Sequence, residues 1–305
     1  MVGLVALALL PVALLIALGH GLKRSGFLGE SFWPQAERLT YYVLLPALFL
    51  HSMATAEIST LPVWELATVL TGSTLLVAVG LVLTRPLMQM QGDAFTSVFQ
   101  GAIRFNSYIG VTMAAWLFGG RGIALAALCS AVLVPLVNVL AILVFARFGA
   151  ARLNVRGVVM QVVTNPLVLS CLGGLLLQAL HTSLPVGLEP ALKSLGAASM
   201  PMGLLCVGAA LHFGAARRWV KPLVISSSVK FMVLPAVTFL IAKAVGANET
   251  TLLIAMLFQT LPTASSSYIL ARQLGGDAPL MAGITATQTV LAALAMPLIL
   301  GLVAG

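Results

Sequence analysis

The sequence predicts an all-α membrane protein with ten transmembrane helices, arranged as two inverted repeats of five helices each. Three observations lead to this prediction: an apolar composition, ten apolar stretches of membrane-spanning length, and a weak internal repeat. Apolar residues make up 60% of the chain and charged residues only 8%, with a mean hydropathy of +1.08. Soluble domains carry roughly 25% charged residues. A soluble chain so poor in charge could not cover its surface, so the composition indicates an integral membrane protein.

The ten predicted helices follow from the length that a bilayer requires, about 20 mostly apolar residues. The first stretch has no positive charge before it and is followed by Lys23 and Arg24. This order is the reverse of a cleaved signal peptide and predicts a first helix whose N-terminus lies outside. The predicted helices cover residues 3–20, 38–54, 63–84, 94–118, 122–146, 160–180, 194–212, 221–244, 249–272 and 278–303.

The basic residues predict the orientation of these helices. Eleven Lys and Arg lie in the loops after odd-numbered helices, against three on the opposite side (Arg121, Lys193 and Lys243). Cytoplasmic loops carry the excess of basic residues, so both termini are expected on the outer side of a cytoplasmic (inner) membrane. The net charge of +8 is spread over short loops, and we therefore expect no nucleic-acid partner. The eleven residues are Lys23, Arg24, Arg38, Arg85, Arg147, Arg152, Arg156, Arg217, Arg218, Lys221 and Arg272.

A weak repeat divides the chain into residues 1–150 and residues 157–305. Pro11 and Pro46 in the first half are matched in pattern by Pro166 and Pro201, each 155 positions further on. Five helices per half is an odd number, so the second half enters the membrane from the opposite side. Inverted repeats of this kind are typical of secondary transporters, whose substrate site lies where discontinuous helices meet.

Two polar stretches interrupt equivalent helices of the two halves. "LPTASSSY", residues 261–268, contains a helix-breaking proline and five hydroxyl groups, and "IRFNSYIGV", residues 103–111, holds the equivalent place in the first half. Proline inside a helix removes a backbone hydrogen bond and clashes with the preceding turn. We therefore predict that helices 4 and 9 are broken and cross at mid-membrane. The alternative is a simple kink at Pro262, with small residues that let helices pack closely.

The chain resembles the auxin efflux carrier family of transporters. The resemblance is carried by "VPLVNVLAILV", "TNPLVLSCLGGLLL", "MPMGLLCVGAAL", "SSSVKFMVLPAV" and "LPTASSSYILARQLGGD", in this order. It implies a fold shared with sodium/bile-acid symporters, in which helices 1, 2, 6 and 7 form a scaffold bundle and helices 3–5 and 8–10 a transport bundle. A homodimer would form through the scaffold bundle. Family members often have a proline at both crossings, whereas here Asn106 to Gly110 must break helix 4 without one.

The predicted substrate site combines helix ends with intramembrane polar side chains. Half-helices that begin near Asn106 and Ser266 would point free amides at one place, which suits a carboxylate. Arg104 and Lys230 are basic residues inside spans, and each either meets the substrate or caps helix carbonyls. Asn138 either joins helices or bonds the substrate. The predicted substrate-binding residues are Arg104, Asn106, Ser107, Tyr108, Gly110, Asn138, Pro262, Ser265, Ser266, Ser267 and Tyr268, with support from Lys230, Gln100 and Gln259 and from Gln288 in reserve.

These features predict a secondary transporter that moves a small organic anion, a carboxylate resembling malonate or auxin, by alternating access. The alternatives are a sodium-coupled symporter of the bile-acid type and a membrane sensor that binds its ligand without transport. No H-E-x-x-H, G-x-S-x-G or Walker A motif is present, so we expect no enzyme activity, and neither a cofactor nor a metal. The expected partners are the organic anion and the lipid bilayer.

Overall fold

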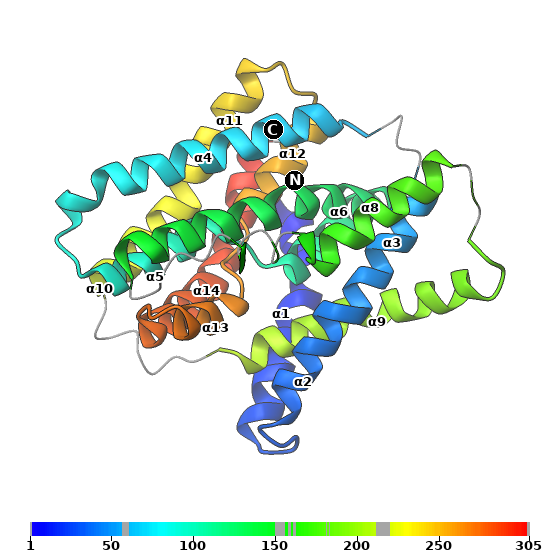
Figure 1. The fold of residues 1–305 in the computed structure, drawn as a ribbon, viewed down its shortest axis with the longest axis horizontal. Helices are drawn as coiled ribbons and strands as arrows, with labels where there is room; N and C mark the ends of the chain where they lie inside the picture. The colour runs from blue at the N-terminus through cyan, green and yellow to red at the C-terminus, as the bar shows by residue number, and fades with distance from the viewer. Residues whose placement is uncertain are drawn as a thin grey trace.

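The structure is a computed structural model that describes residues 2–56, 61–149, 156–157, 160, 163–180, 182, 184–211 and 220–303. Arg152, Arg217 and Arg218 of the charge count lie outside the described residues. The described part is built of helices and the turns between them (Figure 1). The helices of the first half are α1 (Val2–Arg24), α2 (Phe32–Leu39), the π-helix η1 (Thr40–Leu44), α3 (Leu45–Thr55), α4 (Val63–Met88), α5 (Gly92–Ile103) and α6 (Ser107–Phe148).

The second half also contains a segment interrupted by a π-helical turn. η4 is a second π-helical turn, and it links α10 and α11 into one long segment as η1 links α2 and α3. The helices are α8 (Pro166–Ala179), α9 (Leu188–Ala209), α10 (Val220–Ser228), η4 (Val229–Val233), α11 (Leu234–Ala244), α12 (Glu249–Gln259), α13 (Ser266–Gln273) and α14 (Ala278–Val303).

Each of the ten predicted ranges contains helix in the structure. Six of the described helical segments are long and apolar enough to cross a membrane, and the longest of them, Gly92–Phe148, includes two predicted spans. The two predicted spans meet at Gly119, whose φ of 59° lies in the left-handed region that glycine tolerates. Helix α8 begins later than the predicted residue 160, because Asn165 caps it and Pro166 occupies its first position.

The helices interrupted at the polar stretches follow the same plan in both halves. α5 ends, the chain is extended, and α6 begins; α12 ends, the chain is again irregular, and α13 begins. A glycine with positive φ then follows each second helix, Gly119 after the first turns of α6 and Gly275 after α13. The repeated order of helix, break, helix and glycine supports the predicted internal repeat.

Helix packing separates the described helices into two groups. α1 packs on α9, and α3 packs on both α8 and α9. Glycines allow these close approaches, because a Cβ at Gly19 would overlap the carbonyl of Leu205 and a Cβ at Gly208 that of Ile16. The second group comprises α4, α5, α6 and α10–α14, which contact one another around α5 and α6. We call the first set the α1–α9 group and include in it α2 and η1, which contact α9. We call the second set the α5–α6 group. The two groups touch where α6 contacts α3, α8 and α9 and where α1 contacts α14.

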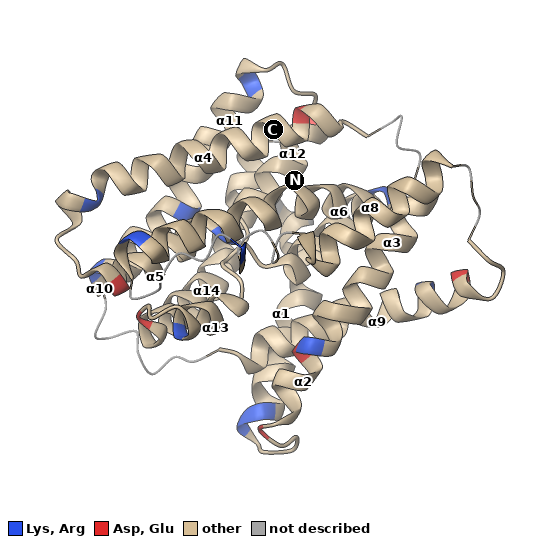
Figure 2. Cartoon of the chain, viewed as in Figure 1, with Lys and Arg blue, Asp and Glu red and all other residues tan. Residues whose placement is uncertain are grey.

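The outer surface of several helices is apolar, as a lipid-facing surface requires. On α1, Leu7, Leu10, Leu14 and Leu18 are all more than half exposed and recur at the spacing of one helix face. Figure 2 shows that charged side chains lie mainly at helix ends, away from the middle of these faces. The basic residues gather at the ends of α1, α4, α6 and α13, on one side of the molecule.

Candidate functional site

The two helix breaks are joined by a backbone hydrogen bond. α5 ends at Ile103, and Arg104 and Asn106 have extended backbone conformations before α6 begins. α12 ends at Gln259, and the helix resumes only at Ser266. The amide of Asn106 donates to the carbonyl oxygen of Pro262 at 2.8 Å. The predicted interruptions are therefore real breaks that contact each other, and the alternative of an unbroken helix kinked at Pro262 is wrong.

Asn106 forms the N-terminus of α6. Its Oδ1 accepts from the amides of Tyr108 at 3.1 Å and Ile109 at 3.2 Å, which is the usual arrangement of an N-cap asparagine. A new helix can therefore begin here without a proline, because the Asn106 side chain accepts the hydrogen bonds of amides that have no carbonyl acceptor within the helix. The first amide of the helix, that of Ser107, has no intrahelical partner. It carries part of the positive end of the α6 dipole.

The N-terminus of α13 is organised differently. Ser265 is its N-cap residue but its hydroxyl does not cap the helix; it donates instead to Oε1 of Glu37 on α2 at 2.9 Å. The amides of Ser267 and Tyr268 donate to the carbonyls of the irregular segment at 3.1 and 3.2 Å. The amide of Ser266 is left as the first of the helix, without an intrahelical partner.

Arg104 is held in place by both neighbouring helices. It is 9% exposed, and its Nη1 donates to Oδ1 of Asn138 at 2.9 Å while Nη2 donates to Oγ of Ser266 at 3.2 Å. Its Nε has no hydrogen-bond partner among the described residues. Both partners are neutral, so the guanidinium keeps its positive charge without a carboxylate beside it.

Lys230 supports the backbone of the same segment. Its side chain is completely buried, and Nζ donates to the carbonyl oxygen of Arg104 at 3.0 Å. The residue belongs to η4, where the extra residue of a π-helical turn is a frequent feature of functional sites. Of the two roles predicted for Lys230, the structure shows the capping of a carbonyl freed by the break.

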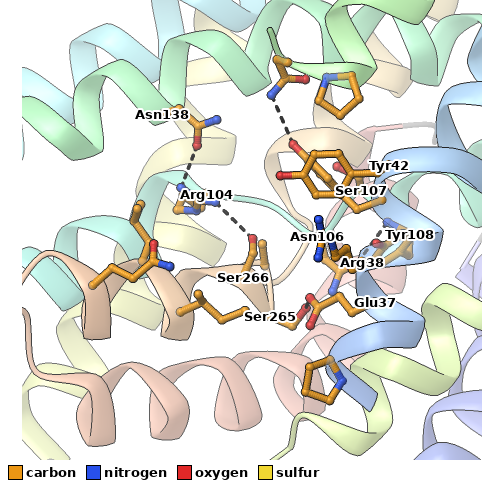
Figure 3. Close-up of a pocket in the computed structure, with 18 of the residues that line it drawn as sticks. Glu37, Arg38, Tyr42, Arg104, Asn106, Ser107, Tyr108, Asn138, Ser265 and Ser266 are labelled. Carbon is orange, nitrogen blue, oxygen red and sulfur yellow. Dashed lines mark hydrogen bonds between the residues drawn. The ribbon is translucent and has the colours of Figure 1, made fainter. Parts of the chain in front are cut away.

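A cavity of about 450 Å³ lies between the two helix groups, next to the breaks (Figure 3). Arg104, Asn138 and Ser266 lie together on one side of it, and Glu37 lies with Ser265 on another. A smaller space of about 40 Å³ extends behind Arg104, between Val134 and Val137. The wall of the main cavity is formed by Pro34, Glu37, Arg38, Tyr41, Tyr42, Arg104, Asn106, Ser107, Tyr108, Asn138, Thr164, Asn165, Pro166, Ala264, Ser265, Ser266, Ile269, Leu270 and Gln273.

The tyrosine at the start of α6 contacts the α1–α9 group. A Cβ at Gly203 of α9 would overlap the ring of Tyr108, so the glycine provides the space that the ring occupies. Tyr108 is 7% exposed, and its hydroxyl has no hydrogen-bond partner among the described residues although it belongs to the cavity wall. This hydroxyl and Nε of Arg104 are unsatisfied polar groups beside the cavity, where a polar ligand could satisfy them.

Seven of the predicted substrate-binding residues are in the cavity wall, namely Arg104, Asn106, Ser107, Tyr108, Asn138, Ser265 and Ser266. Four others lie away from it. Gly110 packs inside the protein, where a Cβ would lie 2.7 Å from Cδ1 of Leu261. Pro262 contributes its carbonyl to the backbone bond, Ser267 is buried against the hydroxyl of Thr263, and Tyr268 is 38% exposed on α13.

Three buried glutamines lie near the breaks, and two of them bond to neighbouring segments. Oε1 of Gln288 on α14 accepts from the amide of Thr263 at 3.0 Å, and its Nε2 donates to the carbonyl of Gly101 at 3.0 Å. Gln288 therefore binds both broken segments at once. Gln259 donates to two hydroxyls of α4. The amide group of Gln100 is fully buried and has no hydrogen-bond partner among the described residues.

Glu37, the acidic residue of the described cavity wall, is not among the site residues predicted from sequence. It lies immediately before the predicted span 38–54, because α2 begins at Phe32, six residues before the apolar stretch. Tyr41 and Asn165, which are joined by a hydrogen bond of 3.2 Å, were also missed. No group of three His, Cys, Asp or Glu in the described residues is placed to hold a metal.

Comparison with known protein families identifies a match in the second half of the chain. The family model described as membrane transport protein, the domain of the auxin efflux carriers, matches residues 151–300. This range contains α8 to α13 and most of α14, and so includes Pro262, Ser265 and Ser266. No curated protein matches the chain.

Proposed function

Because the chain belongs to the membrane transport family of the auxin efflux carriers, we propose that it moves a small organic carboxylate across the cytoplasmic membrane by alternating access. Membership in this family and the long apolar helices identify a multi-pass membrane transporter and not an enzyme. The class of substrate, the mechanism and the orientation are the proposal. They rest on the geometry of the cavity.

The observation that carries the proposal is the convergence of positive charge on one cavity. The guanidinium of Arg104 is buried there with neutral partners only. The first amides of α6 and α13, those of Ser107 and Ser266, belong to residues of the same wall. Helix N-termini and arginine are the groups that bind carboxylates in proteins without a metal. A cavity of about 450 Å³ also has the size of an ordinary small-molecule site.

The cavity wall is shared by the two helix groups, which supports alternating access. Glu37, Tyr41 and Asn165 belong to the α1–α9 group, whereas Arg104 and Ser266 belong to the α5–α6 group. A substrate bound between two groups that slide past each other is exposed first to one side and then to the other. We therefore assign the α1–α9 group as the scaffold bundle and the α5–α6 group as the transport bundle.

We also propose an orientation for the transporter. The basic helix ends gather on one side of the molecule (Figure 2), and cytoplasmic ends carry the excess of basic residues. On this proposal the basic side faces the cytoplasm and both termini lie outside. The cavity, whose wall includes Arg38 in the last turn of α2 and Gln273 at the end of α13, then opens inward, so the structure represents the inward-facing form.

Exchange in proteoliposomes tests the proposal. Mono- and dicarboxylates, among them indole-3-acetate and malonate, are first screened as stabilisers of the purified protein in detergent. Each stabilising anion is then tested for counterflow with and without a sodium gradient. We expect counterflow without sodium, reduced at least tenfold in Arg104→Ala and unchanged in Lys193→Ala, which removes a positive charge from an exposed position on α9.

The alternatives give different results in the same assay. Counterflow that requires a sodium gradient would identify a sodium-coupled symporter. Binding without counterflow would identify a sensor. If no carboxylate binds, or if Arg104→Ala exchanges every bound anion at the wild-type rate, the assignment of the site is wrong.

A further inference from the structure

Glu37 is a carboxylate in a cavity otherwise arranged for anions. It is the only acidic residue of the described cavity wall, and it is partly buried. The hydroxyl of Ser265 donates to it at 2.9 Å, and this is the one hydrogen bond of its side chain among the described residues. Neither Arg104 nor Arg38 lies within salt-bridge distance of it among the described residues. A carboxylate so placed is sensitive to any further negative charge that enters the cavity.

The surroundings of Glu37 contain few groups that could take up or release a proton. Glu37 interacts electrostatically with the phenol of Tyr108 in α6 and the thiol of Cys206 in α9. The same cavity wall contains the phenols of Tyr41 and Tyr42 in η1 and the guanidinium groups of Arg38 and Arg104. Phenols, thiols and guanidinium groups ordinarily change protonation above neutral pH. Among these groups, Glu37 is therefore the one whose protonation state an anion can shift near neutral pH.

From this arrangement, and resting on the proposed function, we propose that Glu37 is the proton site that couples carboxylate binding to proton binding. A carboxylate bound by Arg104 adds a like charge to the cavity that contains Glu37, and a nearby like charge favours the protonated form of a carboxyl group. Glu37 then takes up a proton from the cytoplasm. Linkage is reciprocal, so protonated Glu37 binds the carboxylate more tightly by the same factor.

The hydrogen bond to Ser265 connects this protonation to movement. Glu37 lies on the scaffold bundle and Ser265 on the transport bundle, so their bond joins the two bundles in the inward-facing form. A hydroxyl bond to an ionised carboxylate is roughly twice as strong as a bond to a neutral one. Protonation of Glu37 weakens the bond and favours sliding only when anion and proton are both bound.

Binding measured against pH in detergent tests the proposal and avoids diffusion of the protonated acid through lipid. The probe is indole-3-acetate, or malonate if only that anion binds. Between about pH 6.5 and pH 8.5 a carboxyl of ordinary pKa stays ionised, so the charge of the probe hardly changes. We expect the wild-type Kd to rise by at most tenfold per pH unit, the limit for one linked proton, and by about thirtyfold in total. This total corresponds to two like charges about 8 Å apart at an effective dielectric constant of about 20.

Two variants separate the role of Glu37 from a general effect of charge. Glu37→Gln is expected to bind the probe with a Kd that does not change with pH and equals the wild-type value at low pH. Glu30→Gln removes a negative charge from an exposed position before α2 and should keep the wild-type pH dependence. A pH-indicator dye in weak buffer should report uptake of up to one proton per anion bound by the wild type. This measurement on the wild type decides the question even if Glu37→Gln fails to fold.

The outcomes distinguish this proposal from the proposed function. Binding of the probe to the wild type but not to Arg104→Ala would support the anion site. If that binding is independent of pH and neither releases nor takes up a proton, only the proton site is refuted. Parallel pH dependence in wild type and Glu37→Gln also refutes it. If no carboxylate binds at any pH, both the proposed function and the proton site are wrong.

Discussion

Replacing Gln288 by leucine should destabilise the protein strongly, because this one side chain holds both helix breaks. Leucine has nearly the same volume but cannot bond. The amide of Thr263 and the carbonyl of Gly101 would then be buried without their present partner. Each orphaned backbone group costs about 1–3 kcal/mol. The bond to Ser226 at 3.2 Å adds about 0.6 kcal/mol, an average for side-chain bonds in membranes. The expected loss of stability is about 3–6 kcal/mol.

Gln100→Leu is the matched control. Gln100 is fully buried like Gln288, and it lies on α5 one residue before Gly101, but its amide group has no hydrogen-bond partner among the described residues. Removing an unsatisfied amide costs no hydrogen bond, so this variant should be as stable as the wild type or more stable. The two variants make the same chemical change at the same depth. Their difference therefore isolates the hydrogen bonds that Gln288 makes.

The buried cysteines provide the assay. Cys129, Cys171 and Cys206 are all free and buried, so a thiol-reactive fluorophore reports unfolding in detergent as they become accessible. With about 2 °C per kcal/mol for a chain of this size, Gln288→Leu should lower the apparent melting temperature by roughly 5–12 °C. Gln100→Leu should leave it unchanged or raise it. Equal losses in the two variants would refute the reasoning, because burial alone would then explain both.

Three further predictions concern the helix ends and the buried charge. Asn106→Ala removes the N-cap of α6 and should cost about 1 kcal/mol of stability and abolish anion binding. Asn248→Ala removes the N-cap of α12; in the same assays it should reduce stability by a similar amount and leave binding intact. Lys230→Met should reduce counterflow but change the melting temperature by only a few degrees, because an apolar side chain avoids the desolvation of the ammonium group. Burial, with Asp93 nearby, raises the pKa of Asp277, so protons bind the folded state more tightly. As pH rises through this pKa, that stabilisation is lost. The melting temperature of the wild type, measured relative to that of Asp277→Asn, should therefore fall between about pH 4 and neutrality. A difference in melting temperature that stays constant over this range would exclude the raised pKa.

The breaks could be predicted from sequence because their signals are local. Proline at position 262 removes an amide, and asparagine at position 106 offers a side chain that competes for backbone bonds. Each effect acts within a few residues, so each can be read without knowing the fold. The comparison of the two halves then placed the two breaks at equivalent positions, and the bond from Asn106 to Pro262 agrees with that placement.

The surroundings of the breaks could not be predicted because they depend on which helices pack together. Glu37 precedes an apolar stretch and looks like an ordinary end residue, yet α2 brings it to Ser265, 228 positions away. Gly203 is one of several small residues in its helix, and only the fold places it against the ring of Tyr108. Gly110 shows the opposite error. A glycine beside a predicted break suggested a ligand contact, but its missing Cβ serves close packing against Leu261.

The two half-helices of the site are equivalent in sequence order but not in chemistry, and this difference gives the cavity a direction. At α6 the side chain of Asn106 satisfies two amides, and no acidic side chain is bonded there. At α13 the hydroxyl of Ser265 is already bonded to the carboxylate of Glu37. On the proposed function, a substrate carboxylate would be repelled by Glu37 where it bonds Ser265, and attracted to Arg104 and the amide of Ser107. The rest of the substrate must then extend toward Glu37, where a proton removes the repulsion. A symmetric pair of helix ends would bind an anion equally well in either direction; a single acid on one side is sufficient to orient it.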